Sequence, residues 1–378
     1  MRIPSVLQVV ISDRPYGAAR VAFSLTKHLH ELTDVGVMVN EDLRSLFEQL
    51  DGVRVDVLPI KFQGKWKSPA TSPSTLFQYL ESYLQLNRAS ESFSTDIVHL
   101  HLPNAYLLSF GNFGKSAKML TIHGPMFESS ARFFEDILVR IGPLKTGRLT
   151  AVKPSIAKEF ELRTGRKVEV VENGVDSEEI GRLAAAASDP DYNAVIALKN
   201  KGFRIVVSVG RLERRKGQMQ LLKALENLRK KREEIRLVFV GDGPDASELE
   251  RYAIDNSLND DVIFLGFKEN PYPFYSAADV VVGTLSSTLK GVDLVELEPL
   301  ALRKKVLVGF DQEKSSRLGE TVTYCDSNSP TDIAEKLDLL LNAQPTSANS
   351  GLQELLQQSS WTNVCRQYIS IYESMVSK

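Results

Sequence analysis

The sequence predicts an α/β protein with two tandem domains, each built on a parallel, doubly wound sheet, that face each other across a cleft. Short apolar segments alternate with amphipathic helical segments, a pattern typical of parallel sheets covered by helices. The alternation pauses after about residue 171 and starts afresh at Arg204. The length of 378 residues is too great for one ordinary core and suits two domains.

The first half of the chain contains the elements of one such sheet. Apolar strands are predicted at 6–11, 35–39, 53–60, 96–101, 119–123, 149–152 and 168–171. A helix from about 19 to 32 carries Val21, Leu25 and Leu29 on one face. Residues 172–192 are polar, contain an Ala run and end near Pro190, which indicates an interdomain connection.

The second half repeats the alternation. Strands are predicted at 204–209, 235–240, 262–265, 280–282, 305–308 and 322–324. Ser329 and Pro330 indicate the N-cap and first residue of a helix through about 341. A last helix at 361–376 places Val364, Tyr368 and Tyr372 along one face. We place the domains at 1–180 and 181–355, with the terminal segment at 356–378.

The segment 204–217 is the strongest local signal for a binding site. A buried strand runs into a turn with four Arg or Lys residues, and a helix follows with Leu222, Leu225 and Leu228 on one face. Open α/β sheets bind ligands at such turns, and cations there suit an anion. Arg211 and Lys216 are the candidates, while Arg214 and Arg215 are interpreted as solvated.

Composition restricts the function classes. The net charge of -2 gives no reason to expect nucleic-acid binding, which needs a basic surface. Cys325 and Cys365 lack metal-ligand spacing, which favours a reducing, cytoplasmic compartment. The first apolar run is interrupted by Gln8 and ends at Asp13, which fits a core strand better than a signal peptide.

A membrane contact, if any, is expected to be peripheral, at the inner membrane face. No run approaches the roughly 20 apolar residues that span a bilayer. The loop at 61–74 holds three Lys, two Pro and Trp66. Its interpretation stays open between a solvated loop and a surface for an acceptor or for anionic headgroups.

Seven motifs follow one another over nearly the whole chain: TDIVHLH, TIHG, VENGVD, GRLERRKG, VGDGP, FLGFKENPYPFYSAADVVVG and LVELEPLA. In sequence and in order they resemble the motifs of a known family, the retaining, GT-B-fold group 1 glycosyltransferases. The resemblance implies a GT-B fold of two Rossmann-like domains. The N-terminal domain would bind the acceptor, the C-terminal domain the nucleotide-sugar donor, and the last helix would pack back on the N-terminal domain.

The resemblance also assigns roles to single residues. Arg211 and Lys216 would hold the donor diphosphate, and fixed cations stabilise the negative charge that the leaving group gains. Gly17 would let the backbone approach the donor, since it has no Cβ. Phe267 and Leu294 would contact the donor. His123 would lie near the transferred sugar, where it could donate a hydrogen bond to a hydroxyl or to the leaving phosphate. His99 and His101 are interpreted as structural.

The sequence departs from the family at the sugar pocket. Glu298 matches the second glutamate of the E-x7-E signature and would accept hydrogen bonds from the ribose hydroxyls. The first glutamate is replaced by Lys290, and Asp293 adds a carboxylate nearby. Pro299 implies either a helix that starts late or a remodelled helix entry. Three explanations stay open: a donor carrying an acid that pairs with Lys290, a substitute role for Asp293, or loss of catalysis.

We therefore expect a metal-independent, retaining glycosyltransferase that needs no cofactor beyond a nucleoside diphosphate sugar. The acceptor would be a hydroxyl on a glycan, a lipid-linked molecule or a protein. Asp189 and Asp191 form a D-x-D pair, which we attribute to chance because it lies in the connecting segment. The alternative is a non-catalytic, glycosyltransferase-like subunit that binds a partner or a glycan. A dehydrogenase is disfavoured because residues 12–20 lack the G-x-G-x-x-G fingerprint.

Overall fold

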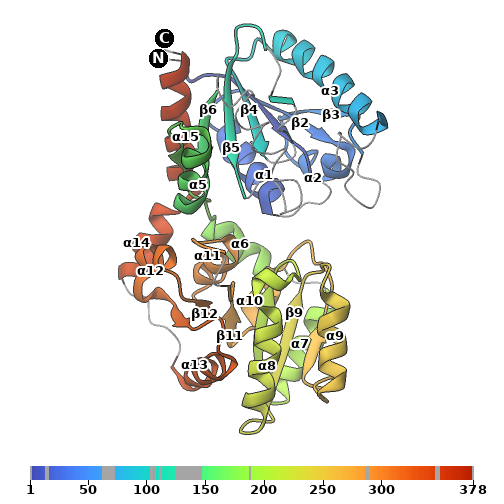
Figure 1. Cartoon of the computed structure of the whole chain (residues 1–378), viewed down its shortest axis with the longest axis vertical. Helices are drawn as coiled ribbons and strands as arrows, with labels where there is room; N and C mark the ends of the chain where they lie inside the picture. Colours follow the sequence, from blue (N-terminus) through green and yellow to red (C-terminus); the bar gives the residue numbers. More distant parts are fainter. Residues whose placement is uncertain are drawn as a thin grey trace. The chain divides into compact units, whose positions relative to one another are not determined.

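The chain forms two compact units in the computed structural model (Figure 1). The first unit comprises Met1–Gly174 together with Trp361–Lys378, and the second comprises Val175–Ser360. The sequence placed these two divisions at 180/181 and at 355/356. The structure describes residues 2–12, 17–61, 73–102, 105, 108–109, 113–124, 147–186, 189–286, 289–344 and 350–376.

The first unit contains a parallel sheet in the order β3-β2-β1-β4-β5-β6-β7. Its strands are β1 (Val6–Val10), β2 (Val35–Asn40), β3 (Arg54–Leu58), β4 (Ile97–Leu102), β5 (Ala117–Ile122), β6 (Arg148–Ala151) and β7 (Glu169–Val170). β1 is buried throughout and pairs with both β2 and β4, as a continuous apolar strand should. The strand order reverses between β1 and β4, which makes their carboxyl ends the expected ligand position.

Helices from both ends of the chain pack in this unit. They are α1 (Gly17–His30), α2 (Arg44–Phe47), α3 (Pro73–Ser92), α5 (Pro154–Thr164) and α15 (Trp361–Val376). α15 lies against α1, and its Trp361 ring stacks on His28 with ring centroids 5.8 Å apart. A Cβ on Gly174 would lie 2.6 Å from the Trp361 ring, so only glycine fits under this contact. The C-terminal helix is therefore part of the N-terminal unit.

The second unit contains a parallel sheet in the order β10-β9-β8-β11-β12-β13. Its strands are β8 (Arg204–Val209), β9 (Ile235–Val240), β10 (Val262–Phe264), β11 (Val280–Val282), β12 (Lys305–Gly309) and β13 (Thr323–Cys325). Its helices are α6 (Ser177–Ala185), α7 (Pro190–Asn200), α8 (Gln218–Arg229), α9 (Ala246–Asp255), α10 (Tyr272–Ala277), α11 (Leu294–Ala301), α12 (Gln312–Leu318), α13 (Pro330–Asn342) and α14 (Ser350–Gln358). The order reverses here between β8 and β11.

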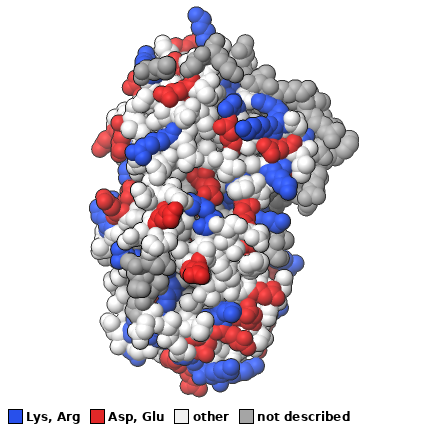
Figure 2. Space-filling model, turned by 90° about the vertical axis from the view of Figure 1, so that its left-hand side faces the viewer, with Lys and Arg blue, Asp and Glu red and all other residues white. Residues whose placement is uncertain are grey.

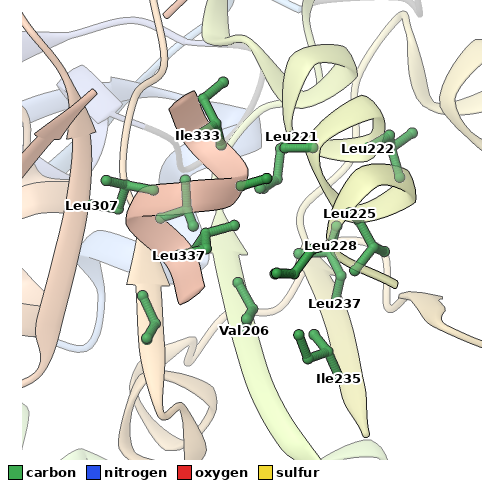
Figure 3. Close-up of a cluster of buried hydrophobic side chains, with 14 of the residues drawn as sticks. Val206, Leu221, Leu222, Leu225, Leu228, Ile235, Leu237, Leu307, Ile333 and Leu337 are labelled. Carbon is green, nitrogen blue, oxygen red and sulfur yellow. The ribbon is translucent and has the colours of Figure 1, made fainter. Parts of the chain in front are cut away.

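Side chains of alternate residues in the second sheet point to opposite faces, as the two-residue period of a strand requires. Each face packs in a hydrophobic core of its own. On one face, α8 and α13 pack over Val206, Leu237 and Leu307 (Figure 3). On the other face, α7 and α10 pack over Ile205 and Val238. Because helices cover both faces, ligands can reach this sheet only at its edges.

Most predicted elements are confirmed, several of them to the residue. β8, β9, β11 and α15 have the predicted bounds. Ser329 caps α13 by accepting a hydrogen bond from the Asp332 N–H at 3.2 Å. Helix α1 begins two residues earlier than predicted, at Gly17. It also ends two residues earlier, at His30, because residues 31–33 form a turn.

The connection predicted at 172–192 contains the boundary between the two units, which falls after Gly174. It also contains helical residues that were not predicted: residues 177–185 form α6 and residues 190–192 begin α7, and both helices pack on α10 in the second unit. The missed signals are the two N-caps: Asp176 accepts from the Glu179 N–H, and Asp189 accepts from the Asp191 N–H beside Pro190. Of the Trp66 loop, residues 62–72 lie outside the described part of the chain.

The surface carries both signs of charge. On the face drawn in Figure 2, Lys and Arg side chains are interspersed with Asp and Glu. Among the helices that the structure describes, none is long and apolar enough to cross a bilayer.

Candidate functional site

The turn after β8 is pressed against the turn after β11 in the second unit. Gly217 has a φ of +83°, and a Cβ there would lie 1.8 Å from the Leu285 carbonyl oxygen. The Leu285 N–H also donates to the Lys216 carbonyl oxygen at 3.1 Å. Glycine at 217 is therefore required twice, by its backbone conformation and by this approach. The contact brings Lys216 beside the segment that leads into α11.

Lys216 and Asp293 form an ion pair in this corner. The Lys216 Nζ lies 3.4 Å from the Asp293 Oδ2, and the two side chains are 21% and 25% exposed. Asp293 is the N-cap of α11, and Leu294 is its first residue. Two residues singled out from the sequence are thus in contact. Asp293, the carboxylate expected near the sugar pocket, lies against Lys216, the candidate for binding the diphosphate.

Arg211 lies in the same turn but is more accessible. Its side chain is 50% exposed, and its Nε lies 3.8 Å from the Glu213 Oε2. Glu213 also accepts a hydrogen bond from the Arg215 Nε at 2.9 Å. Arg214 is 86% exposed, in keeping with its interpretation as a solvated cation. Arg211 is therefore a half-exposed cation whose ion pair with Glu213 is long, and a ligand can reach it.

Glycines in the neighbouring turns let the backbone segments pack in direct contact. A Cβ on Gly241, after β9, would lie 2.0 Å from the Gly210 carbonyl oxygen. The Gly241 N–H donates to the Gly266 carbonyl oxygen at 2.7 Å, which places the 39% exposed Phe267 beside the β9 turn. The Gln218 amide nitrogen donates to the Arg211 carbonyl oxygen at 2.9 Å. The backbone around Arg211 is thus fixed by its neighbours.

A buried ion pair that the sequence analysis missed supports the entry of α11. Glu296 and Lys314 are both 0% exposed, with the Glu296 Oε1 3.5 Å from the Lys314 Nζ. Glu296 also accepts from the backbone N–H groups of Thr284 at 3.0 Å and of Asp293 at 2.6 Å. The spacing Asp293-x-x-Glu296 is that of a capping box, the signal that could have identified Glu296.

Glu298 and Pro299 lie within α11. Glu298 is 8% exposed, and its Oε1 accepts a hydrogen bond from the Tyr272 hydroxyl at 3.3 Å. Pro299 is the sixth residue of the helix, so the first of the two alternatives, a helix that starts late, is wrong. The helix instead ends at Ala301, and the Pro299 carbonyl accepts from the Lys304 N–H at 2.9 Å. Lys290 is exposed in the segment between β11 and α11.

The carboxyl edge of the first unit's sheet is a stack of histidines. His123 follows β5, and its Nε2 lies 2.9 Å from the His101 Nδ1. Ring centroids are 5.2 Å apart for His101 and His123, and 4.4 Å apart for His99 and His101. The His99 Nδ1 meets the Tyr372 hydroxyl of α15 at 2.8 Å. His123, proposed to act alone, is therefore one member of a hydrogen-bonded group.

Burial keeps these rings neutral. It lowers the pKa of His99 to about 3 and the pKa of His123 to about 4. Burial, and then the neighbouring His99 and His123, hold the pKa of His101 well below its usual value. Burial raises the pKa of Tyr372 well above its usual value, so its hydroxyl stays protonated beside His99. At neutral pH this edge carries no charge on its rings.

Gly17 is the first residue of α1 and has a φ of +32°. A Cβ there would meet nothing within 4 Å, so its need for glycine comes from the backbone conformation and not from crowding. Residues 13–16 of the same turn lie outside the described ranges.

The D-x-D pair has a structural role. Asp189 caps α7, and the Lys268 Nζ lies 2.9 Å from an Asp189 oxygen and 2.5 Å from an Asp191 oxygen. The Lys268 side chain, through its hydrogen bond, lowers the pKa of Asp189. Within the described ranges, no group of three or more His, Cys, Asp or Glu side chains is arranged to hold a metal ion.

Two family models match the chain. The Glycosyltransferase Family 4 model matches residues 15–179, and the Glycosyl transferases group 1 model matches residues 193–353. The first falls within the N-terminal unit apart from its last residues, and the second within the C-terminal unit.

Curated relatives match over part of their length. The chain is 31% identical over 217 residues to the N-acetylgalactosamine-N,N'-diacetylbacillosaminyl-diphospho-undecaprenol 4-alpha-N-acetylgalactosaminyltransferase of Campylobacter jejuni, with 55% of each protein covered. It is 33% identical over 135 residues to the lipopolysaccharide core biosynthesis glycosyltransferase LpsD of Rhizobium meliloti, covering 35% of this chain and 36% of that protein. The matches thus span about half of the first relative and about a third of the second.

Solved structures match over nearly the whole chain. HepE of Anabaena, in complex with UDP and glucose, has a TM-score of 0.77 at 18% identity, with 98% of this chain and 100% of that chain covered. A glycosyltransferase from Rickettsia africae has a TM-score of 0.72 at 17% identity, with 99% of both chains covered. At such identity the likeness shows the fold, and here it is GT-B. With one family model in each unit and this shared architecture, the chain belongs to the group 1 glycosyltransferases.

Proposed function

We propose that this chain transfers a sugar from a nucleoside diphosphate sugar to an acceptor hydroxyl, with retention at the anomeric carbon and without a metal ion. The observation that carries the proposal is the position of Lys216. The contact between Gly217 and Leu285 holds it at the carboxyl edge of the second sheet, beside the reversal of strand order.

Arg211 and Lys216 supply the positive charge that this reaction needs. Arg211 can bind two phosphate oxygens through its planar guanidinium, while Lys216 offers a point charge. Lys216 is only 21% exposed, so an anion beside it is less screened than in bulk water. A diphosphate bound here would compete with Asp293 for Lys216.

The remaining donor contacts are assigned to residues around α11 and β10. Glu298, oriented by the Tyr272 hydroxyl, would accept hydrogen bonds from the ribose hydroxyls. Phe267 and Leu294 would supply apolar contacts. Lys290 is exposed and could pair with an acid on the donor. Gly17 would let the backbone approach the phosphates.

The proposed chemical step is a same-face substitution. The bond from the anomeric carbon to the diphosphate oxygen breaks, and its electron pair leaves with the diphosphate. The acceptor oxygen forms the new bond on that face, and its proton passes to an oxygen of the leaving group. Arg211 and Lys216 stabilise the charge on that group, while His123 positions the sugar. The carboxylates of Asp189 and Asp191 are occupied by Lys268, which supports a reaction without a metal at that pair.

The relatives suggest which compounds to test first. The UDP-glucose complex of HepE supports uracil as the first nucleotide base to test. The name of the Campylobacter jejuni relative contains a diphospho-undecaprenol, which supports a lipid-linked glycan as the first acceptor and a peripheral membrane location.

A second candidate function is a non-catalytic subunit that binds a partner or a glycan. The observation that favours it is Lys290, which reverses the charge at the position of the family's first glutamate. This function predicts no donor hydrolysis and a stable complex with a partner.

The test is a thermal-shift panel of UDP, GDP, ADP and their sugars, followed by assays of donor consumption. We expect one donor to raise the melting temperature of the wild type but not of Glu298→Ala, and to be consumed when an acceptor is present. Glu335→Ala, an exposed change on α13, should respond like the wild type. No response of the wild type to any nucleotide would exclude the enzyme and leave the non-catalytic function.

A further inference from the structure

The histidine stack contains a chain of hydrogen bonds that begins at a buried glutamine. Gln8 lies in β1 and is 0% exposed. Its Oε1 lies 2.9 Å from the His101 Nε2, and the His101 Nδ1 lies 2.9 Å from the His123 Nε2. The chain joins β1, β4 and the segment after β5 at the carboxyl edge of the first sheet. Gln8 is thereby linked to the histidine proposed to position the sugar.

The chemistry of the amide sets the direction of these bonds. An amide oxygen can only accept, so the His101 Nε2 must carry the proton. A neutral imidazole has one N–H, and therefore the His101 Nδ1 is a bare acceptor. Both nitrogens of His99 meet other groups, the Tyr372 and Thr121 hydroxyls, so His99 does not compete for His101.

The same logic fixes His123. Its Nε2 faces the bare Nδ1 of His101 and must donate, so its own Nδ1 is left without a proton. We propose that Gln8, acting through His101, holds His123 as the neutral Nε2–H tautomer, with Nδ1 as a hydrogen-bond acceptor. Burial of the stack supports the neutral state, since it disfavours charged rings.

This state selects the chemistry that His123 can recognise. A bare Nδ1 accepts a hydrogen bond from a hydroxyl and repels the oxygen of a phosphate. His123 would therefore receive a hydroxyl of the sugar or of the acceptor, and not the leaving diphosphate. This consequence rests on the proposed function, whereas the tautomer itself does not. Gln8 and His101 are positioning residues, because they act through His123.

The orientation of the Gln8 amide sets both tautomers. Its Nε2 is buried and has no acceptor among the described residues. A buried donor without a partner is costly, and an apolar side chain would avoid that cost. The Oε1 bond to His101 is the interaction that the amide makes here. Turning the amide over would present its NH₂ group to His101 and would reverse both tautomers. His123 would then carry its proton on Nδ1, which an experiment can distinguish from the proposed state.

The decisive experiment is a two-bond ¹H–¹⁵N spectrum of the histidine rings in the full chain, with the His123 signals assigned from His123→Asn. In the wild type we expect a protonated Nε2 and a bare Nδ1. Gln8→Met keeps the volume but removes the acceptor, and should give a mixture of the two tautomers. Gln8→Glu should protonate His101, whose Nδ1–H then donates to His123 and inverts its tautomer. Gln49→Met, an exposed change in the same unit, should leave the spectrum unchanged.

Two results would overturn the inference: a protonated Nδ1 on His123 in the wild type, or an unchanged tautomer in Gln8→Met. Activity tests the functional consequence separately. In Gln8→Met, kcat should fall at least about tenfold while the thermal shift with the donor nucleotide is unchanged. If the expected tautomer is observed in a protein that transfers no sugar, the tautomer inference stands and the proposed function fails.

Discussion

The carboxyl edges of the two sheets have the same topology and opposite chemistry. In the C-terminal unit the edge carries partly exposed charges, with Lys216 paired to Asp293 and Arg211 half open to solvent. In the N-terminal unit the edge carries neutral rings joined by hydrogen bonds, the buried His101 and the partly buried His123 among them. In both units the strand order reverses at this position. The fold therefore determines where a ligand can bind, and the residues of the turns determine which ligand.

The two edges should also respond differently to substitution and to acid. The charged edge depends on single cations that a ligand can recruit, so substitutions there should change function and leave the fold intact. The neutral edge depends on rings whose protonation destabilises the folded N-terminal unit, so a fall in pH should affect this unit first.

Acid should destabilise the N-terminal unit. Burial lowers the pKa of His99 to about 3 and of His123 to about 4, and the pKa of His101 also lies well below its usual value. The unfolded chain binds these protons near pH 6.5, so the stability is present above about pH 6.5 and is lost as the pH falls toward about 4. Each ring contributes up to about 1.4 kcal/mol per pH unit.

Urea unfolding at pH 7.5 and at pH 5.0 measures this loss. His123→Asn should lose less stability between the two pH values than the wild type, because one ring no longer takes up a proton. Equal unfolding free energies of the wild type at both pH values would contradict the neutral stack.

Breaking the buried ion pair of the C-terminal unit should be nearly as costly. Lys314→Met leaves Glu296 charged and buried, which should lower the unfolding free energy by about 3–5 kcal/mol. Adding Glu296→Gln removes that charge and should restore most of the loss, as urea denaturation would show. The exposed pair of Arg44 and Glu48 offers the control, since Arg44→Ala should cost at most about 0.5 kcal/mol. A loss below about 1 kcal/mol in Lys314→Met would argue against a buried charge on Glu296.

Lys216→Ala should reduce kcat/KM by about a hundredfold or more, because the leaving diphosphate loses a fixed cation. The unfolding curve should stay close to that of the wild type, since Lys216 is on the edge and not in a core. Arg214→Ala removes an 86% exposed cation of the same turn and should have little effect. Near-normal turnover of Lys216→Ala would remove this residue from the site.

Glu298→Gln should have the smallest of these effects. The amide keeps one acceptor oxygen for the ribose but loses the charge, so we expect about tenfold weaker binding of the nucleotide, measured by calorimetry. Tyr272→Phe, which removes the hydroxyl that orients Glu298, should show a weaker effect in the same direction. An unchanged affinity in both variants would place the ribose elsewhere.

Much of the fold could be predicted because its signals are local. The apolar run of β8, the cap at Ser329 and the apolar face of α15 are each contained in one segment. The capping box at Asp293 and Glu296 was also readable but was overlooked. The N-caps Asp176 and Asp189 within 172–192 are local signals of the same kind, since each opens a helix that the polar composition of this connection does not predict.

Local sequence signals account for the alternation of strands and helices, the place of the cationic turn and the residues that can carry charge there. Periodicity encodes which face of a segment is buried, so these features need no knowledge of distant partners. Three contacts instead depend on how distant segments fold together: Lys314 pairs with Glu296, Gly217 fits against Leu285, and Gln8 contacts His101 across 93 residues of chain. Such partners meet because the strand order brings separate turns to one edge, and a single segment carries no record of that order.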